Sequence, residues 1–296
     1  MKIIRAEHLG MCFGVRDAIA LAMKESEKNP LTILGELVHN DTVLGALHEK
    51  GIQIESQLAQ VETTTVMITA HGASDRTLRQ VQSRGHNVVE ATCPLVHFAH
   101  RSLAGLMRQG YYPIIIGKRD HVEVRGLTGD LDAYAVVLSE TDVMNLAEQP
   151  RIGVVAQTTQ PIDKVRQLVG FIRRRFPQSE VRFIDTVCQP TKQRQTAAVD
   201  LAEQSDVVIV IGGTHSNNTR ELVATCSRFC SRVHHVPTAA DLQAEWLWNA
   251  ETVGITAGTS TPDEVIHSVE QRIQELAAHR RAERSRCNLA VELTVA

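Results

Sequence analysis

Short aliphatic runs and longer stretches of helical periodicity alternate along the whole chain of 296 residues. Runs such as Val207–Ile211 have the length of buried strands, and stretches such as residues 94–109 have the length of helices. Strands that are apolar throughout and alternate with helices are typical of parallel sheets covered by helices. The pattern therefore predicts an α/β fold with mainly parallel sheets. The predicted strands are residues 3–5, 31–34, 65–69, 87–89, 113–116, 135–138, 151–155, 181–184, 207–211, 233–236 and 252–255, and the predicted helices include residues 15–27, 94–109, 162–176, 192–203 and 263–280.

A three-part pattern occurs three times along the chain, and each copy begins with a cysteine directly before a helical stretch: Cys12, Cys93 and Cys188. A strand ending in a polar segment follows, and then a second strand ending in small polar residues. The repeat predicts three similar α/β units in a pseudo-threefold (trefoil-like) arrangement around a central cluster. Their expected bounds are residues 1–92, which include the N-terminal strand, then 93–187 and 188–280, with a C-terminal tail at 281–296.

The polar segments stand at the carboxyl ends of their strands, where parallel α/β sheets bind ligands. Four of these segments contain a histidine, and three of these histidines, His39, His71 and His121, are candidate ligands. The fourth, His215, shares the location but stands beside Ser216 and Asn218, which are equally plausible ligands. Three imidazoles together with nearby hydroxyl, amide and helix N-terminal N–H groups would suit a compact anion such as a diphosphate. The alternatives are three unrelated polar segments, or strand-end histidines with ordinary structural partners.

The chain has six cysteines, too few for a disulfide scaffold, and no C-x-x-C pair of the kind common in zinc sites. Three single cysteines in different units suit an iron–sulfur cluster at a domain junction, with one iron left open. The alternative for any one of them is a small buried hydrophobic residue. Cys226 and Cys230 are expected to be such packing residues, and Cys287 an incidental thiol.

Glu123 is the carboxylate that stands among the polar segments, two residues after His121. Enclosed in a water-poor site, it would be held partly protonated and could serve as a proton donor. Thr158 and Thr159 follow another strand and offer hydroxyls that could relay a proton. A lone Glu at a strand end is more often a helix cap or an ion-pair partner, so only the surrounding groups favour a catalytic role.

Composition and charge exclude several classes of function. A formal net charge of −3 and 4% aromatic residues argue against a nucleic-acid-binding protein. The N-terminus lacks the pattern of a signal peptide, and no apolar stretch is long enough to span a membrane, so a cytoplasmic protein is expected. Neither a P-loop nor a G-x-G-x-x-G motif is present, so electrons for a redox reaction would have to arrive from a source other than a bound dinucleotide.

Nine short features occur in one order, namely G-M-C-F-G-V, E-L-V-H-N, A-H-G, A-T-C-P-L-V, H-V-E-V, Q-T-T, a third cysteine, S-N-N-T and T-A-G-T-S-T-P. In this combination the chain resembles the 4-hydroxy-3-methylbut-2-enyl diphosphate reductase (LytB) family. The resemblance implies reductive dehydroxylation of that substrate to isopentenyl and dimethylallyl diphosphates, the last step of the non-mevalonate isoprenoid pathway. It also implies a [4Fe–4S] cluster with one iron not bound by cysteine, and ferredoxin or flavodoxin as electron donor.

The resemblance also implies roles for individual residues. Cys12, Cys93 and Cys188 match the cluster ligands. Glu123 matches the proton-delivering carboxylate, and Thr158 matches the hydroxyl that contacts the substrate alcohol. The residues that match the substrate ligands are His39, His71, His121, Ser216, Asn217, Asn218 and Ser260, with His39 and His121 assigned to the diphosphate.

The chain departs from the family pattern at a few positions. Val122 stands where the family commonly has proline, Asn217 where it often has serine or alanine, and Q-P-T-K-Q follows Cys188, although Thr191 still aligns. The sequence leaves three other classes of function open. They are a quinolinate-synthase-like dehydratase, a divergent non-catalytic [4Fe–4S] sensor, and a zinc-stabilised structural protein.

Overall fold

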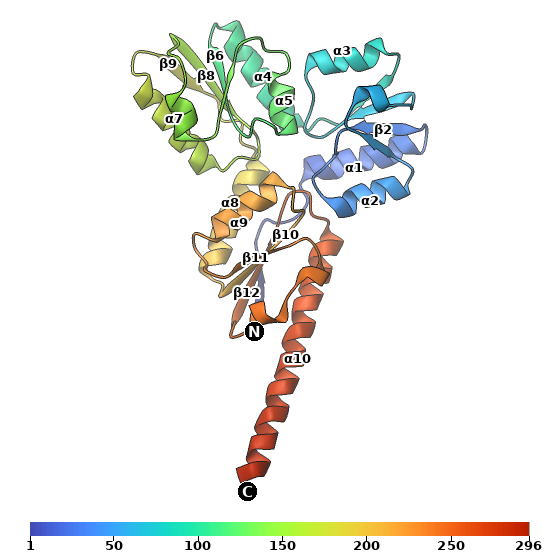
Figure 1. Cartoon of the computed structure of the whole chain (residues 1–296), viewed down its shortest axis with the longest axis vertical. Helices are drawn as coiled ribbons and strands as arrows, with labels where there is room; N and C mark the ends of the chain where they lie inside the picture. Colours follow the sequence, from blue (N-terminus) through green and yellow to red (C-terminus); the bar gives the residue numbers. More distant parts are fainter. Residues whose placement is uncertain (296) are drawn as a thin grey trace. The chain divides into compact units, whose positions relative to one another are not determined.

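The computed structural model describes residues 1–279 with their side chains and, through the last helix, the backbone as far as Val295 (Figure 1). The strands are β1 (Lys2–Arg5), β2 (Leu31–Leu34), β3 (Gln53–Glu55), β4 (Thr65–Ile68), β5 (Asn87–Glu90), β6 (Tyr112–Ile116), β7 (Ala135–Val137), β8 (Arg151–Ala156), β9 (Glu180–Phe183), β10 (Val207–Ile211), β11 (Val233–Val236) and β12 (Thr252–Ala257). The α-helices are α1 (Phe13–Ser26), α2 (Asp41–Glu49), α3 (Asp75–Ser83), α4 (Pro94–Arg108), α5 (Val122–Thr128), α6 (Glu140–Met144), α7 (Ile162–Arg175), α8 (Gln189–Glu203), α9 (Asn217–Cys226) and α10 (Asp263–Val295).

The strands form three four-stranded sheets, in the orders β3-β2-β4-β5, β7-β6-β8-β9 and β11-β10-β12-β1. Every strand pair in them is parallel. This confirms the predicted fold class of three parallel α/β units. In each sheet the two strands that lead into the polar segments are the two central neighbours. The polar segments of each repeat therefore leave the sheet side by side, as the repeat predicts.

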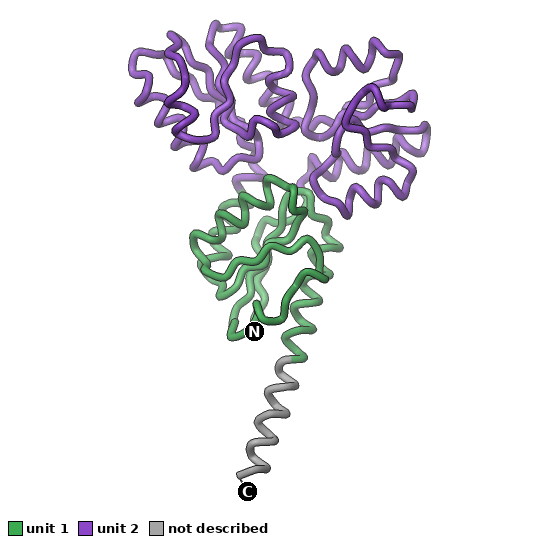
Figure 2. Tube along the Cα trace, viewed as in Figure 1, with its two compact units in different colours: residues 1–11, 193–296 green, residues 12–192 purple. Residues whose placement is uncertain are grey.

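The chain divides into two compact units, drawn in different colours in Figure 2. Unit 1 contains residues 1–11 and 193–296 with the sheet β11-β10-β12-β1, and unit 2 contains residues 12–192 with the other two sheets. The placement of the N-terminal strand in the first repeat is wrong, because β1 pairs with β12 along Lys2–Arg5. The third repeat has no strand of its own after β12, and the N-terminus supplies it.

The predicted repeat bounds and the pseudo-threefold arrangement around a central cluster remain predictions. The predicted tail, residues 281–296, and Cys287 lie outside the residues whose side chains are described.

The sheet around β6 shows why its strands are apolar throughout. Ile114 and Ile116 point into a core with Leu168 and Ile172 of α7. Ile115 points to the other face, where the core includes residues of α4. Figure 1 shows α7 and α4 on either side of β6 and β8. Burying one such side chain stabilises the fold by roughly 1.5–3 kcal/mol. In a strand that is covered on both faces, every side chain is buried and adds such a contribution.

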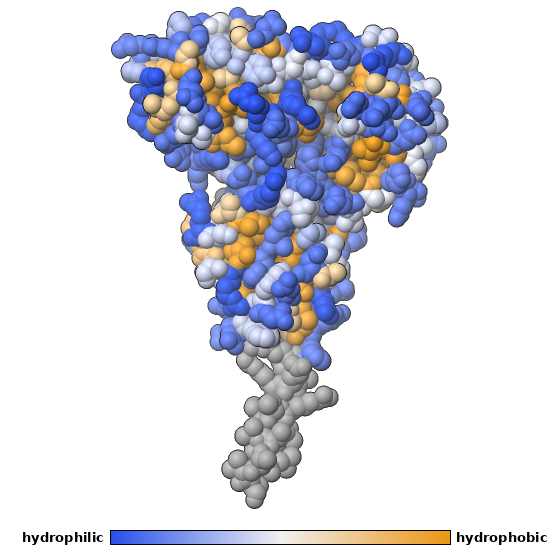
Figure 3. Space-filling view, in the orientation of Figure 1, coloured by the Kyte–Doolittle hydropathy of each residue, from blue (hydrophilic) through white to orange (hydrophobic). Residues whose placement is uncertain are grey.

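The face of the molecule shown in Figure 3 is largely hydrophilic, with apolar residues in several separate patches. Among the residues that the structure describes, no helix combines the length and the apolar character that crossing a membrane requires.

Candidate active site

Three cysteines of unit 2 stand directly before helices, and each acts as an N-cap. The backbone N–H four residues on donates to the cysteine carbonyl oxygen in every case: Arg16 to Cys12 (3.0 Å), His97 to Cys93 (3.0 Å) and Lys192 to Cys188 (3.1 Å). A helix N-terminus presents free N–H groups and the positive end of the helix dipole, which favour a thiolate. The local sequence thus places three sulfur atoms where negative charge is stabilised.

In the absence of a metal, burial opposes the effect of the helix N-termini on the pKa of these thiols. It raises the pKa of the Cys93 thiol and raises that of Cys188 to about 11. Hydrogen bonds oppose the shift, from the N–H groups of Leu95 and Val96 toward Cys93 and from Thr191 toward Cys188. These two thiols are therefore protonated at neutral pH, and a metal that binds them must release their protons.

The surroundings of the three sulfurs fit a metal group larger than a single ion. A Cβ atom on Gly14 would lie 2.6 Å from the Cys93 Sγ, so the glycine leaves the space that this thiol occupies. A tetrahedral zinc with Zn–S bonds of about 2.3 Å would hold its sulfurs within roughly 4 Å of one another. The three sulfurs do not form a group with all ligand atoms within 4.8 Å. The donor set therefore fits an iron–sulfur cluster better than zinc.

Three histidines of unit 2, predicted from three separate strand ends, lie together. Their ring centroids are 5.1 Å (His39–His71), 5.6 Å (His39–His121) and 5.5 Å (His71–His121) apart. Burial, and then the charges of the other two rings, lower the pKa of His71 well below its usual value, so this ring is neutral. Its Nδ1 is buried without a hydrogen-bond partner among the described residues.

The hydrogen bonds of the other two rings set which nitrogen of each ring can face a ligand, and only that of His121 favours an anion over a metal ion. The Nδ1 of His39 donates to Glu36, at 2.9 Å. The Nδ1 of His121 accepts the backbone N–H of Glu123, at 3.2 Å, which leaves the proton of the neutral ring on Nε2. A metal requires an unprotonated nitrogen, whereas an oxyanion requires N–H donors. The His121 tautomer is therefore the one that binds an anion.

Glu123 is buried, and both of its carboxyl oxygens accept hydrogen bonds from Thr158. The Thr158 backbone N–H donates to Oε1 at 2.6 Å, and the Thr158 hydroxyl donates to Oε2 at 2.9 Å. Burial raises the pKa of Glu123 to about 7, although both bonds from Thr158 oppose that shift. A carboxyl group with this pKa exchanges a proton near neutral pH, as a general acid must.

The start of α5 positions Glu123 even though Val122 replaces the family's proline. Val122 is the first residue of the helix, and His121 is its N-cap. Proline is common at that position because its missing N–H is unpaired there in any case, so valine can occupy it without loss of a helix bond. The departure leaves the start of α5 and the Glu123 contacts intact.

Gln157 holds the segments after β6 and β8 together, a role that the sequence did not reveal. Its Oε1 accepts from the Lys118 N–H (3.0 Å) and from Gln160 Nε2 (3.1 Å), and its Nε2 donates to Thr159 Oγ1 (2.9 Å). The side chain thereby links the segment that carries His121 and Glu123 to the one that carries Thr158. The sequence feature that could have pointed to Gln157 is its position in the Q-T-T motif.

The remaining predicted ligands belong to unit 1, at the carboxyl ends of β10 and β12. Ser216 caps α9 by accepting the Thr219 N–H at 3.3 Å. Asn218 Oδ1 accepts the Thr259 N–H at 3.0 Å, which fixes the amide group. Several buried polar atoms here have no hydrogen-bond partner among the described residues, namely Asn217 Nδ2, Asn218 Nδ2 and Ser260 Oγ. Buried donors without partners are costly, so they indicate a ligand that accepts from them.

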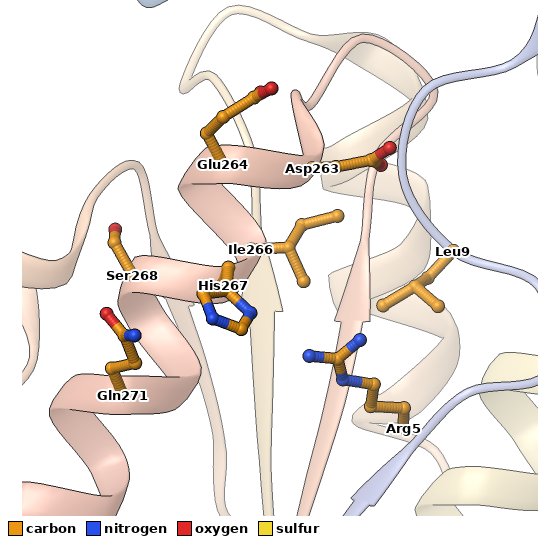
Figure 4. Close-up of a pocket in the computed structure, with 8 residues that line it drawn as sticks. All are labelled: Arg5, Leu9, Asp263, Glu264, Ile266, His267, Ser268 and Gln271. Carbon is orange, nitrogen blue, oxygen red and sulfur yellow. The ribbon is translucent and has the colours of Figure 1, made fainter.

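A surface pocket of about 650 Å³ lies elsewhere in unit 1, where β1 meets the start of α10 (Figure 4). It is lined by Arg5, Leu9, Asp263, Glu264, Ile266, His267, Ser268 and Gln271. Arg5 pairs with Glu270, which ties the N-terminal strand to the last helix. None of the predicted site residues lines this pocket.

Two cysteines of unit 1, Cys226 and Cys230, are packing residues, as predicted. Cys226 and Cys230 are buried in one apolar cluster with residues of α8 and β10. Their sulfurs contact backbone carbonyl oxygens, for example Cys226 Sγ to Ala198 O at 3.7 Å and Cys230 Sγ to Ser205 O at 3.4 Å. Burial raises the pKa of the Cys226 thiol to about 12, so it stays a neutral thiol.

The fold and unit 2 define an α/β protein with helix-capping thiols, a histidine triad and a buried acid in one compact unit. The chain belongs to the LytB protein family, whose sequence model matches residues 3–274. The predicted family is thereby confirmed.

Relatives and solved structures of this family resemble the chain over most of its length. A "4-hydroxy-3-methylbut-2-enyl diphosphate reductase" of Trichlorobacter lovleyi is 38% identical over 279 residues, 93% of this chain and 99% of the relative. The protein of the same name from Aquifex aeolicus is 38% identical, over 93% of this chain and 97% of the relative. The solved E-1-hydroxy-2-methyl-but-2-enyl-4-diphosphate reductase of Plasmodium falciparum matches with a TM-score of 0.85 and 27% identity, over 90% of this chain and 86% of that one.

Proposed function

We propose that this protein catalyses the reductive dehydroxylation of 4-hydroxy-3-methylbut-2-enyl diphosphate to isopentenyl and dimethylallyl diphosphates. Each substrate molecule takes up two electrons and two protons, its allylic C–O bond breaks, and the oxygen leaves as water. The observation that carries the proposal is the Glu123–Thr158 pair, a buried proton donor in the unit that contains the three cysteines and the histidine triad. The names of the relatives support the same reaction.

Cys12, Cys93 and Cys188 would hold a [4Fe–4S] cluster, which supplies electrons one at a time together with Lewis acidity when it is bound. We assign electron delivery to ferredoxin or flavodoxin, as the resemblance to the family implies, and the chain's lack of a dinucleotide-binding motif agrees with this assignment. The described cysteines are free thiols, and thiols of this kind persist in a reducing compartment. We therefore place the reaction in the cytoplasm.

Glu123 and Thr158 form a proton relay whose direction follows from their hydrogen bonds. The Thr158 backbone N–H donates to Oε1 of Glu123, so this oxygen is an acceptor and a proton on the carboxyl group resides on Oε2. Oε2 then donates to the Thr158 hydroxyl, and the bond seen between these two oxygens is reversed. The hydroxyl is thereby free to donate its own proton to the substrate oxygen, and Glu123 restores it. The relay supplies a proton without admitting bulk water.

The diphosphate ligands that we propose are polar side chains at strand ends, and most of them offer an N–H or O–H donor. In unit 2 they are His39, His71 and His121, and in unit 1 they are Ser216, Asn217, Asn218 and Ser260. The neutral His71 and the Nε2–H of His121 donate without a net charge, and the buried amide and hydroxyl groups of unit 1 have no partner of their own among the described residues. An oxygen atom of a diphosphate can accept a hydrogen bond from a group of either kind.

Purification without oxygen followed by analysis of metal, sulfide and activity tests the proposed function. We expect brown protein with near-stoichiometric iron and acid-labile sulfide, and formation of the two five-carbon diphosphates when a reduced viologen dye and the substrate are added. Reduced ferredoxin and flavodoxin in parallel assays identify the carrier. Zinc without sulfide would overturn the cluster assignment, and a cluster without turnover would indicate a sensor instead of an enzyme.

Changing Asn218 to Asp should raise the KM for the diphosphate by roughly 10- to 100-fold, the scale of losing a hydrogen bond to a charged group. The Asp oxygen still accepts the Thr259 N–H, so the segment keeps its position, but a carboxylate replaces the amide donor. Steady-state kinetics separates the KM effect from kcat. Asn87→Asp, the same change on an exposed strand residue, should leave both constants unchanged, and an unaltered KM in Asn218→Asp would remove this residue from the substrate site.

A further inference from the structure

Thr191 places a hydroxyl against one of the three cysteine sulfurs. Its Oγ1 lies 3.0 Å from the Sγ of Cys188, and its backbone N–H donates to the Cys188 carbonyl oxygen, also at 3.0 Å. The residue is fully buried, with 0% of its surface exposed. A thiolate bound to metal has no proton to give, so in the loaded protein the hydroxyl must be the donor and the sulfur the acceptor.

The threefold repeat shows that this hydroxyl is not needed for packing. Each cysteine is followed three residues later by the third residue of its helix, which is Val15 after Cys12, Val96 after Cys93 and Thr191 after Cys188. Valine and threonine have nearly the same shape, so two copies of the repeat fill this position with a methyl group where the third has a hydroxyl. Burying a hydroxyl is costly unless it finds a partner, and here the partner is the sulfur.

We propose that Thr191 is a positioning residue that raises the reduction potential of the cluster by donating a hydrogen bond to the Cys188 thiolate. The inference rests on the proposed cluster at Cys12, Cys93 and Cys188. Reduction adds negative charge that spreads onto the ligand sulfurs, and a hydrogen bond to such a sulfur stabilises the reduced form more than the oxidised form. Hydrogen bonds to ligand sulfurs are among the groups by which proteins set cluster potentials. The first two thiolates lack this donor because valine has no hydroxyl.

A redox titration of the iron–sulfur protein, followed by electron paramagnetic resonance, tests the proposal. In Thr191→Val, which converts the third copy of the repeat to the sequence pattern of the other two, the midpoint potential is expected to shift to a more negative value. Thr191→Ser keeps the hydroxyl and should retain a potential close to that of the unchanged protein. Thr191→Ala removes the hydroxyl without adding a methyl group in its place and should shift the potential in the same direction as Val.

The control is Thr128→Val, because the Thr128 hydroxyl is also buried but donates to the Val124 carbonyl oxygen at 2.9 Å instead of to a sulfur. It should leave the potential unchanged. Equal potentials in the unchanged protein and in Thr191→Val or Thr191→Ala would overturn the inference, as would a Ser variant that behaves like Val. A chain that binds no iron–sulfur cluster before any substitution would instead refute the proposed function, so the two failures are distinguishable.

Discussion

Glu123→Gln is expected to lower turnover by roughly a hundredfold or more, the typical contribution of general acid catalysis. Glutamine can keep both contacts with Thr158, because its carbonyl oxygen accepts the backbone N–H and its amide group donates to the hydroxyl. It has no exchangeable acidic proton, however, and cannot restore the one that Thr158 gives away. Single-turnover assays with the reduced protein should show slow chemistry, while iron content and substrate affinity stay near those of the unchanged protein.

Glu49→Gln provides the matched control, since it makes the same change on an exposed residue at the end of α2. It should leave turnover unaltered. If Glu123→Gln retained the full rate, the proton would have to come from another group, and Thr158 would no longer be part of a relay.

The raised pKa of Glu123 also predicts how stability depends on pH. Its carboxyl group titrates near 4.5 in its ordinary state and at about 7 in the folded protein, so the folded state holds the extra proton between these two values. Folding stability therefore falls as the pH rises through this window, by on the order of 3 kcal/mol for a shift of this size. Urea unfolding at several pH values should show this slope, and it should be weaker in Glu123→Gln. Turnover of the unchanged protein should likewise fall above about pH 7, as the donor loses its proton.

Hydrophobic pattern was enough to predict the strands buried on both faces, because their apolar residues leave few other assignments. Val207–Ile211, which is buried at every position, has the predicted bounds. The partly buried edge strand Val233–Val236 has them as well. Elements with little apolar surface were missed, such as β3, a three-residue edge strand, and α3, in which Val81 is the buried residue. In α3 the signal is local, since Ser74 caps the helix by accepting the Thr77 N–H. The pairing of β1 with β12 could not be predicted, because the hydrophobic pattern of a strand does not specify the strand with which it pairs.

The candidate site was predictable where the same residue type recurs in the repeat, as it does for the cysteines and the strand-end histidines. The resemblance implied a role for Glu123 and one for Thr158, but their two hydrogen bonds needed the fold, because 35 residues separate them. Gln157 and Thr191 were not singled out for a role by the sequence, since glutamine and threonine are common at strand ends and helix starts. Their roles follow from the atoms that they contact.

Gly14→Ala is expected to remove most of the iron and sulfide from the protein. The new Cβ would lie 2.6 Å from the Cys93 Sγ and 3.2 Å from its Cβ, both closer than the roughly 3.5–4.0 Å of a normal contact. Either the thiol rotates away or the start of α1 moves, and both changes displace a sulfur from the position that the cluster requires. Helix propensity acts in the opposite direction, since alanine in a helix is favoured over glycine by about 1 kcal/mol. A loss of iron could therefore not be attributed to a weaker helix.

Gly105→Ala gives the matched comparison, because Gly105 lies within α4, the helix that Cys93 caps, and a Cβ there would meet no atom within 4 Å. This variant should retain its full iron content and gain a little stability. Iron and sulfide analysis after anaerobic reconstitution, with circular dichroism to verify folding, separates the two outcomes. A folded Gly14→Ala protein with iron and sulfide equal to Gly105→Ala would show that the Cys93 sulfur does not need this space, and would weaken its assignment as a cluster ligand.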